Sequence, residues 1–339
     1  MPKTSTVLAF SIAALTAAAA TAYKMGNSCS ASTKTNGKEL LNSAFVFVKP
    51  QANTEATQQL VRSKLTEAGI TIVSECDVSG EKIDSEKLID QHYYAIASKA
   101  TLLNASEIPV PADKFEETFG EKWEDVLKAD RACNALQACE KWKCTPEELN
   151  EVWQKAKITK FGGGFYCGYV TMGNSSLYVF NAFFMTMRSK FVGKGTSIHC
   201  FSVEWSPKTL SWSDFRNKLL GPTDPAEGPE GSIRKTILDS YKELGIASQP
   251  NKGDNGVHAS ASPLEGLAEK TNWLKASIAD DAFGKALLNA GVKEETIKAW
   301  SIDPQINYNA DEKGSIFDAV EDMDVEECFK KLLEFNACN

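Results

Sequence analysis

The sequence predicts a mixed α/β fold. Strand-like and helix-like segments alternate from residue 43 to residue 98, and this order is typical of α/β proteins. The chain has 339 residues, of which 42% are hydrophobic and 9% aromatic. It is therefore long and apolar enough to bury a sizeable core.

The first elements are placed from local patterns. The apolar run "SAFVFVKP" stops at Pro50, as a buried strand does. The next stretch carries one apolar stripe at helical spacing and ends at Gly69. Asp84 or Ser85 is placed to cap a second helix. These patterns predict strands at 43–50 and 70–78 and helices at 54–69 and 84–98.

A helical insertion is expected over residues 100–163. It opens with two prolines and continues with Phe115 and Phe119 at helical spacing. Thr145 and Glu148 then form a capping box around a proline. The glycine triplet in "FGGGF" lacks the Lys-Ser/Thr of a phosphate-binding P-loop, so it is interpreted as a hinge that closes the insertion.

Later segments are assigned by the same rules. They are a helix at 178–191, a strand at 196–205, a helix that starts near residue 231, and helices within 293–339. The chain has a formal net charge of −8, and residues 276–339 carry all of it, with fourteen Asp and Glu against six Lys and Arg. Because this acidic segment also has an apolar face, we expect a docked helical extension. No nucleic acid is expected as a partner, since the rest of the chain is neutral overall.

The N-terminal residues 1–42 have the pattern of a targeting peptide and linker. An uncharged, Ala-rich stretch over 7–23 ends in the small-x-small site Ala20-Thr21-Ala22. Together with the acid-free segment that follows, it resembles the bipartite presequences of complex algal plastids. We expect import into a membrane-bounded compartment, by the secretory route or into a plastid. A cytoplasmic protein, or one anchored in a membrane by its N-terminus, is the alternative.

The nine cysteines are odd in number, scattered, and without a CxxC pair. Neither a disulfide framework nor a zinc site is indicated, so most of them are interpreted as reduced thiols.

His258 lies in "DNGVHASASPLEGLAE", residues 254–269, among residues too small to pack against it. A neutral imidazole in an uncovered position can act as a nucleophile, a general base or a metal ligand. His92 and His199 fall in unrelated elements with no linking carboxylate motif, which disfavours a metal site. The remaining interpretations of His258 are proton transfer, covalent catalysis, or no chemical role at all.

The surroundings of His258 favour attack on phosphorus. Small neighbours admit a bulky anion, and Lys49 and Arg234 can supply positive charge. Glu269 lies about three helical turns into the following segment and could reach back to orient the imidazole.

At these residues the chain resembles the nucleoside diphosphate kinase family. The family's N-x-x-H-x-S-x-S motif reads Asn255-Gly256-Val257-His258-Ala259-Ser260-Ala261-Ser262, followed by the helix-borne Glu269. Four further segments match in the same order: "FVFVKP" with Lys49, "QHYYAI" with Tyr93, "GFYCGYV" with Phe165, and "LLGPTDPAEGPEGSIR" with Thr223 and Arg234. The matches span residues 43–275.

The resemblance implies a ferredoxin-like α/β sandwich with an antiparallel four-stranded sheet. It also implies ping-pong phosphoryl transfer from ATP or another nucleoside triphosphate to a diphosphate, through a phosphohistidine on His258 and with Mg²⁺ on the phosphates. Ser260 and Glu269 would support the histidine. The residues implied to hold phosphates and sugar are Lys49, Tyr93, Thr223, Arg234 and Asn255, and Phe165 would stack on the base.

The chain departs from the family pattern at several positions. Ala259 and Ala261 replace a glycine and an aspartate beside the nucleophile. Where the family has a second phosphate-binding arginine, an ungapped alignment places Asn217 in this chain, and Arg216 is one position away. The family also has an arginine after the helix that carries the His-Tyr pair, and this chain has Lys99 at that position.

A second interpretation therefore stays open: a weakly active nucleotide-binding or scaffolding module. It would act on a protein partner through its insertion and acidic tail. A homo-oligomer is possible by the family resemblance.

Overall fold

The computed structural model describes residues 34–35, 38–309 and 312–338. The targeting peptide expected within 1–42 lies almost entirely outside these residues. In the described part of the chain, no helix has both the length and the apolar character needed to cross a membrane.

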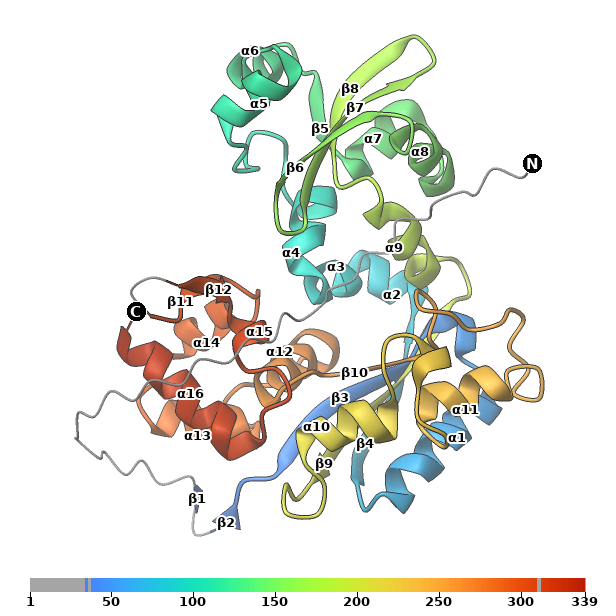
Figure 1. Cartoon of the computed structure of the whole chain (residues 1–339), viewed down its shortest axis with the longest axis vertical. Coiled ribbons are helices and arrows are strands. Elements are labelled where there is room, and N and C mark those ends of the chain that lie inside the picture. Colours follow the sequence, from blue (N-terminus) through green and yellow to red (C-terminus); the bar gives the residue numbers. More distant parts are fainter. Residues whose placement is uncertain (1–33, 36–37, 310–311, 339) are drawn as a thin grey trace. The chain divides into compact units, whose positions relative to one another are not determined.

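An antiparallel four-stranded sheet underlies the predicted site (Figure 1). Its strands are β3 (Asn42–Val48), β4 (Thr71–Ser79), β9 (Ser197–Trp205) and β10 (Val257–Ala259). The order across the sheet is β10-β3-β9-β4, and every neighbouring pair is antiparallel. The strands predicted at 43–50, 70–78 and 196–205 are confirmed.

The centre of the sheet is covered on both faces, which explains why every residue of β3 is buried. The edge strand β4 is mostly exposed. Val46 and Val48 contribute to the core formed with α1 (Glu55–Glu67) and α11 (Ile233–Asp239). Phe45 and Phe47 alternate with them and pack on the opposite face, against α3 (Leu88–His92) and α12 (Pro263–Leu274). The helix α1 begins as the sequence predicts, since the Thr54 side chain accepts a hydrogen bond from the Thr57 amide.

The single helix predicted at 84–98 is wrong. The chain instead forms α2 (Gly80–Ser85), α3, α4 (Tyr94–Ala97) and a π-helical turn over Ser98–Leu102. Ser79, not Asp84 or Ser85, caps the first of these. Lys87 breaks the run because it adopts a left-handed conformation with φ of 55°.

The predicted helical insertion at 100–163 is wrong in composition and in boundary. A second four-stranded sheet, in the order β5-β8-β7-β6, belongs to this part of the chain. Its strands are β5 (Ala132–Asn134), β6 (Lys157–Gly162), β7 (Phe165–Met172) and β8 (Ser175–Phe180). The glycine triplet is a hairpin turn between β6 and β7, where Gly164 has φ of +58°.

Helices accompany this second sheet. They are α5 (Ala112–Phe119), α6 (Trp123–Lys128), α7 (Ala135–Trp142) and α8 (Pro146–Trp153). The capping box at Thr145 and Glu148 is present. The helix predicted at 178–191 begins late, as α9 (Phe184–Val192), because the apolar run before it completes β8.

The acidic segment folds around the outer side of α12 (Figure 1). Its elements are α13 (Ala282–Asn289), α14 (Glu294–Trp300), α15 (Ile316–Ala319), α16 (Val325–Cys338) and the hairpin strands β11 (Gln305–Asn307) and β12 (Lys313–Ser315). Short elements complete the chain: β1 (Lys34–Thr35), β2 (Lys38–Glu39), α10 (Trp212–Asp214), the π-helical turn Phe215–Leu220 and 3₁₀ turns at Pro50–Ala52 and Pro225–Glu227.

Seven of the nine cysteines have described side chains, and none of the seven is in a disulfide. This agrees with their interpretation as thiols.

Candidate functional site

His258 lies in the short edge strand β10, directly opposite Phe47 of β3. Residues paired across a sheet point to the same face, so the imidazole lies on the face covered by α3 and α12. The Phe47 ring stacks on it, with ring centroids 4.8 Å apart. The His258 side chain remains 16% exposed, so packing orients the ring without closing it off from solvent.

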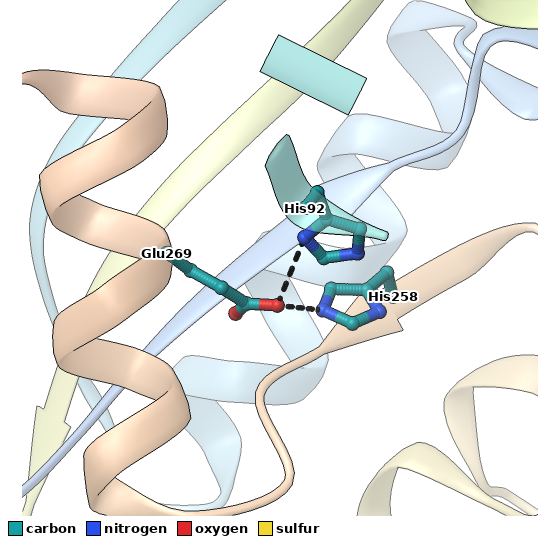
Figure 2. A group of neighbouring side chains, drawn as sticks. All are labelled: His92, His258 and Glu269. Carbon is teal, nitrogen blue, oxygen red and sulfur yellow. Dashed lines mark hydrogen bonds and ion pairs between the residues drawn. The ribbon is translucent and has the colours of Figure 1, made fainter. Parts of the chain in front are cut away.

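Glu269 projects from α12 toward His258 (Figure 2). Its Oε1 lies 2.6 Å from His258 Nε2, and its Oε2 lies 2.5 Å from the Ser260 hydroxyl. Ser260 is fixed in turn, because its Oγ accepts a 2.9 Å hydrogen bond from the Phe45 amide. The backbone of β3 thus fixes Ser260, Ser260 holds the Glu269 carboxylate, and the carboxylate holds His258.

Close packing of α12 on β3 makes this reach possible. At Gly266, a Cβ atom would lie 2.5 Å from the Ser43 carbonyl oxygen, so only glycine fits there without a shift of the helix. Ser262 and Pro263 start the helix immediately after β10, and the Ser262 side chain accepts from the Glu265 amide. The sequence between His258 and Glu269 therefore builds the contact locally.

His92 is the residue that sequence reasoning missed. It ends α3, and its Nδ1 lies 3.2 Å from Glu269 Oε1, the same oxygen that faces His258 (Figure 2). The two imidazoles meet edge to face with centroids 4.6 Å apart. The inference that His92 belongs to an unrelated element is wrong, because α3 and α12 pack side by side on one face of the sheet.

Burial controls the charge state of this cluster. Burial lowers the pKa of His92 to about 3, with the charge of His258 as a second cause. Burial, followed by the charges of Lys49, Arg234 and Arg216, holds the pKa of His258 well below its usual value. Both rings are therefore neutral at pH 7. Burial also raises the pKa of the Glu269 carboxyl.

Two basic side chains, Lys49 and Arg234, are near enough for their charges to act on His258. Burial and then the charge of Arg234 lower the pKa of Lys49 to about 7. The Arg234 guanidinium donates to the Val257 carbonyl at 2.9 and 3.0 Å and to the Gly221 carbonyl at 2.9 Å. Arg234 is thereby fixed beside the backbone of β10, one residue from His258.

Asn255 connects this strand to the loop that carries Thr223. Its Nδ2 donates to the Thr223 carbonyl at 3.0 Å, and the side chain is only 2% exposed. Its Oδ1 is buried without a hydrogen-bond partner. A buried polar atom of this kind normally has a partner, so Asn255 keeps an unused acceptor in the residue that binds the Thr223 loop. Thr223 itself is exposed.

The two predicted aromatic residues have different surroundings. Tyr93 packs edge to face on His92, with centroids 4.5 Å apart, and so joins the cluster. Phe165 does not: it is 7% exposed and lies in the core of the second sheet with Phe161 and Phe180. The structure therefore gives no support to base stacking by Phe165. Lys99 lies over its ring, 5.4 Å from the centroid.

Arg216 has carboxylate partners from the C-terminal extension. Its Nη1 lies 2.6 Å from Glu321 and 2.7 Å from Asp322. The Asp322 amide also donates to the Ala261 carbonyl at 2.9 Å, which fixes the turn beside the loop that leaves β10. The Asn217 amide donates to the Ser213 hydroxyl at 3.2 Å and lies 3.5 Å from Asp322. We name residues 321–324 the acidic turn.

A cavity of about 220 Å³ opens behind the cluster, between α3, α12 and the extension. His92, Glu265 and Glu269 line it from one side, and Lys298 of α14 and Phe317 of α15 from the other. Burial and the neighbouring Glu269 raise the pKa of Glu265. Glu269 thus contacts His258 and at the same time lines this cavity.

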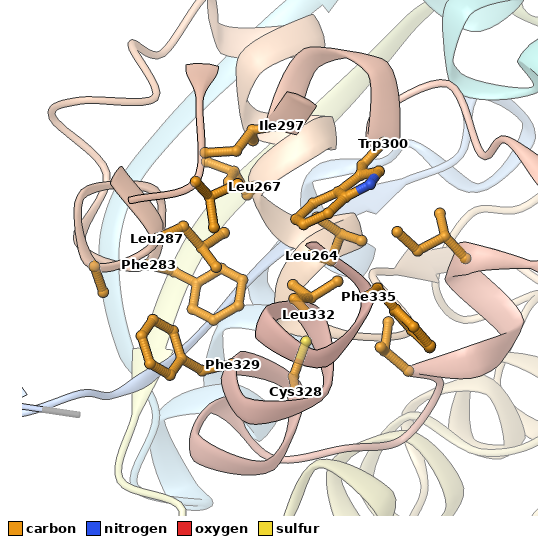
Figure 3. Close-up of a cluster of buried hydrophobic side chains, with 14 of the residues drawn as sticks. Leu264, Leu267, Phe283, Leu287, Ile297, Trp300, Cys328, Phe329, Leu332 and Phe335 are labelled. Atoms are coloured by element: carbon orange, nitrogen blue, oxygen red, sulfur yellow. The ribbon is translucent and has the colours of Figure 1, made fainter. Parts of the chain in front are cut away.

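The helix α12 belongs to two cores at once. Leu264 and Leu267 pack into the core of the extension (Figure 3), while Trp273 packs beneath the sheet with Phe45 and Phe47. His199, by contrast, lies outside the cluster: its ring nitrogens contact Asp77 at 2.9 Å and Glu75 at 3.2 Å on the neighbouring strand β4. This is the packed or edge position expected of a strand histidine.

Comparisons with known proteins give only remote likenesses. No protein-family model matches the chain, and no curated protein matches it. Similar solved structures include nucleoside diphosphate kinases from Encephalitozoon cuniculi (13% identity, TM-score 0.34, 69% of this chain and 90% of that chain covered) and Pyrobaculum aerophilum (17%, 0.33, 69% and 96%). A third is the nucleoside diphosphate kinase of Aquifex aeolicus (14%, 0.33, 69% and 94%). Likenesses with TM-scores this low carry no argument about function, which must rest on the geometry of the site.

Proposed function

We propose that this protein transfers a phosphoryl group from a nucleoside triphosphate to a nucleoside diphosphate through a phosphohistidine on His258. The observation that carries the proposal is the Ser260–Glu269–His258 chain of hydrogen bonds. A nucleophile held by an orienting group, itself held by a third residue, is the arrangement that covalent catalysis needs.

The contact with Glu269 selects the reactive nitrogen. A neutral imidazole carries one proton, and the carboxylate 2.6 Å from Nε2 favours that proton on Nε2. The lone pair is then on Nδ1, which has no hydrogen-bond partner among the described residues. Phosphorylation would form an N–P bond at Nδ1 and break the bond to the leaving diphosphate, and Glu269 would stabilise the positive ring.

The positive side chains fit an anionic substrate. Lys49 and Arg234 lower the pKa of His258 through their charge, so both act electrostatically at the imidazole. Phosphoryl transfer depends mainly on such positioning and charge neutralisation. Thr223, Tyr93 and Asn255 would hold the rest of the nucleotide. When bound, Mg²⁺ would arrive on the nucleotide phosphates and neutralise their charge, and it requires no acidic ligand from the chain.

We also propose that the sheet is the core of a ferredoxin-like sandwich. Numbered along the chain, the four strands lie in the order fourth, first, third, second. Along the chain, helix α1 connects the first strand to the second, and helix α11 comes between the third strand and the fourth. This order supports the topology that the sequence resemblance implies.

The test is phosphate transfer by the purified full chain. Incubated with γ-labelled ATP and Mg²⁺, it should acquire a phosphate that is acid-labile and base-stable, and added GDP should remove it. His258→Ala should take up no label, while the matched control His199→Ala should be labelled like the wild type.

Two outcomes would overturn the proposal. A wild-type protein that binds ATP without becoming labelled would be a nucleotide-binding module rather than a kinase. Label that survives in His258→Ala would place the acceptor elsewhere in the chain.

A further inference from the structure

Three ligand atoms of the site converge on one point. One ring nitrogen of His92, one of His258 and a Glu269 carboxylate oxygen all lie within 4.8 Å of one another (Figure 2). Among the described residues, this is the one group of at least three His, Cys, Asp and Glu side chains close enough to share a metal ion.

The spacing is close to that of an occupied site. Donors that each lie about 2.0–2.2 Å from one zinc ion are roughly 3.4 Å apart. His92 Nδ1 and Glu269 Oε1 are already 3.2 Å apart, and His258 Nε2 and the same oxygen are 2.6 Å apart. A small side-chain rotation of Glu269 would open the second distance. The indole of Trp273 makes only a long 3.4 Å contact to His92 Nδ1, which a metal can replace.

We propose that His92, His258 and Glu269 form a binding site for a divalent transition metal of the zinc class. Two imidazoles and one carboxylate are a donor set that such ions prefer, whereas Mg²⁺ favours an all-oxygen shell. The cavity behind α12 gives the ion an entry route and room for a water as fourth ligand.

Support around the ligands is already in place. The Ser260 hydroxyl holds Glu269 Oε2, which leaves Oε1 directed at both histidines. Phe47 stacks on His258, and Tyr93 packs against His92, so neither ring can turn freely. Each imidazole can present one ring nitrogen to a metal.

Binding at this site would switch off the nucleophile, an inference that rests on the proposed function. A neutral imidazole that gives its Nε2 lone pair to a metal must carry its proton on Nδ1. The Nδ1 lone pair that would attack phosphorus is then lost. Metal binding and phosphorylation therefore exclude each other at His258.

Metal binding is tested without nucleotide, by calorimetric titration of the metal-free full chain with Zn²⁺ and by the visible absorption of bound Co²⁺. We expect one equivalent to bind and millimolar Mg²⁺ not to compete. His92→Gln and Glu269→Gln should each weaken binding by more than about 100-fold, since loss of a mere supporting partner can already cost 10–100-fold. His199→Gln is the matched control and should bind like the wild type.

Several results would overturn the metal site: no binding by the wild type, unchanged affinity in a folded His92→Gln protein, or loss of binding in His199→Gln. Circular dichroism checks that each variant is folded. If His92→Gln does not fold, His258→Gln, at the more exposed ligand, replaces it.

A separate assay tests the switch. Zn²⁺-loaded protein freed of excess metal should take up little label from a limiting amount of ATP with Mg²⁺, and a zinc-selective chelator should restore labelling. Unreduced labelling of the loaded protein would overturn the switch. Because Zn²⁺ titration needs no nucleotide, a protein that binds Zn²⁺ but is never labelled would refute the proposed function and leave the metal site standing.

Discussion

Glu269 makes use of both carboxylate oxygens, and this determines the chemistry of its neighbours. Oε2 is held by Ser260, while Oε1 faces His258 and His92. Replacement of the carboxylate would remove the group that selects the Nε2–H form of His258. In the proposed reaction, Glu269 would act by positioning this proton rather than by contact with substrate.

Lys49 leads to a prediction about pH. The pKa of Lys49 is lowered to about 7 in the free protein by burial and by Arg234, so the amine loses its charge as pH rises above 7. A bound phosphate would favour the charged form, and nucleotide binding above this pH must then take up a proton. We expect ADP affinity to fall by up to about tenfold per pH unit between roughly pH 7.5 and 9.

Calorimetry in buffers of different ionisation enthalpy measures this proton uptake directly. Nucleotide phosphates are fully ionised in this range, since their last pKa is near 6. Lys49→Arg should remove both the uptake and the slope, because a guanidinium stays charged. A wild type with a flat profile, or Lys49→Arg with an unchanged slope, would refute the assignment.

At the residue scale, the sequence predicts contacts that are close along the chain and misses those that are remote. His258, Ser260 and Glu269 are predicted together because β10 and α12 are consecutive and the spacing of a helix fixes the reach of Glu269. His92 comes from a distant segment, and only the packing of α3 against α12 brings it to Glu269. The sole sequence signal was its place beside Tyr93 in "QHYYAI".

At the scale of elements, a buried ion pair fixes the position of α3. Asp90 is 0% exposed, and both of its oxygens accept hydrogen bonds from Arg188 Nε of α9, at 2.9 and 3.1 Å. Arg188 also contacts Asp84 at 2.5 Å. The pair joins α9, which follows the second sheet, to the helix that ends in His92.

Removal of the arginine should be costly. Arg188→Met would leave the Asp90 carboxylate buried without a positive partner, so we expect a loss of about 3–5 kcal/mol in unfolding free energy. Urea denaturation followed by fluorescence measures the shift. Lys82→Met, which removes a partly exposed pair with Glu86, is the control and should change stability by less than about 1 kcal/mol. A loss equal to that of the control would show that the pair contributes little.

Elements with strong local signals are predicted well, and elements that depend on partners are not. The helix-starting signals at Thr54 and Thr145 are correct because a side-chain cap acts within one turn. The strands β6, β7 and β8 were not predicted, because their apolar and polar residues alternate only over short stretches. These strands are stabilised by pairing with each other, which the local sequence does not reveal. The helix break at Lys87 was not predicted, because no sequence pattern marks a lysine that adopts the left-handed conformation.

At the scale of the whole molecule, the extension reaches back to the site through the acidic turn. Asp324 Oδ1 accepts from the Trp212 amide and from Asn42 Nδ2, each at 2.7 Å. Glu321 and Asp322 meanwhile pair with Arg216. Because the charge of Arg216 acts on His258, the extension neutralises a cation that an incoming phosphate could use.

Release of this cation should strengthen nucleotide binding. In Glu321→Gln/Asp322→Asn, Arg216 is free to pair with phosphate, and asparagine tolerates the left-handed backbone of residue 322, where φ is 61°. We expect ATP to bind about 2- to 5-fold more tightly, since a partly exposed ion pair contributes up to about 1 kcal/mol. Equilibrium titration with a fluorescent ATP analogue measures the change.

Glu327→Gln/Glu334→Gln is the matched control, because it removes the same charge from exposed positions of the same extension. It should leave the affinity within about twofold of wild type. Equal gains in both double variants would mean that overall charge, and not the release of Arg216, sets the affinity.

Helix α12 packs into two hydrophobic cores, and this determines how the site should respond to heating. Leu264 and Leu267 depend on the extension for their burial (Figure 3). Glu269 belongs to the same helix. When the extension melts, these leucines face water, and the helix loses the packing that keeps its carboxylate aimed at His258. The contact between Glu269 and His258 should therefore be lost at the temperature at which the extension melts, even if the central sheet survives to a higher one.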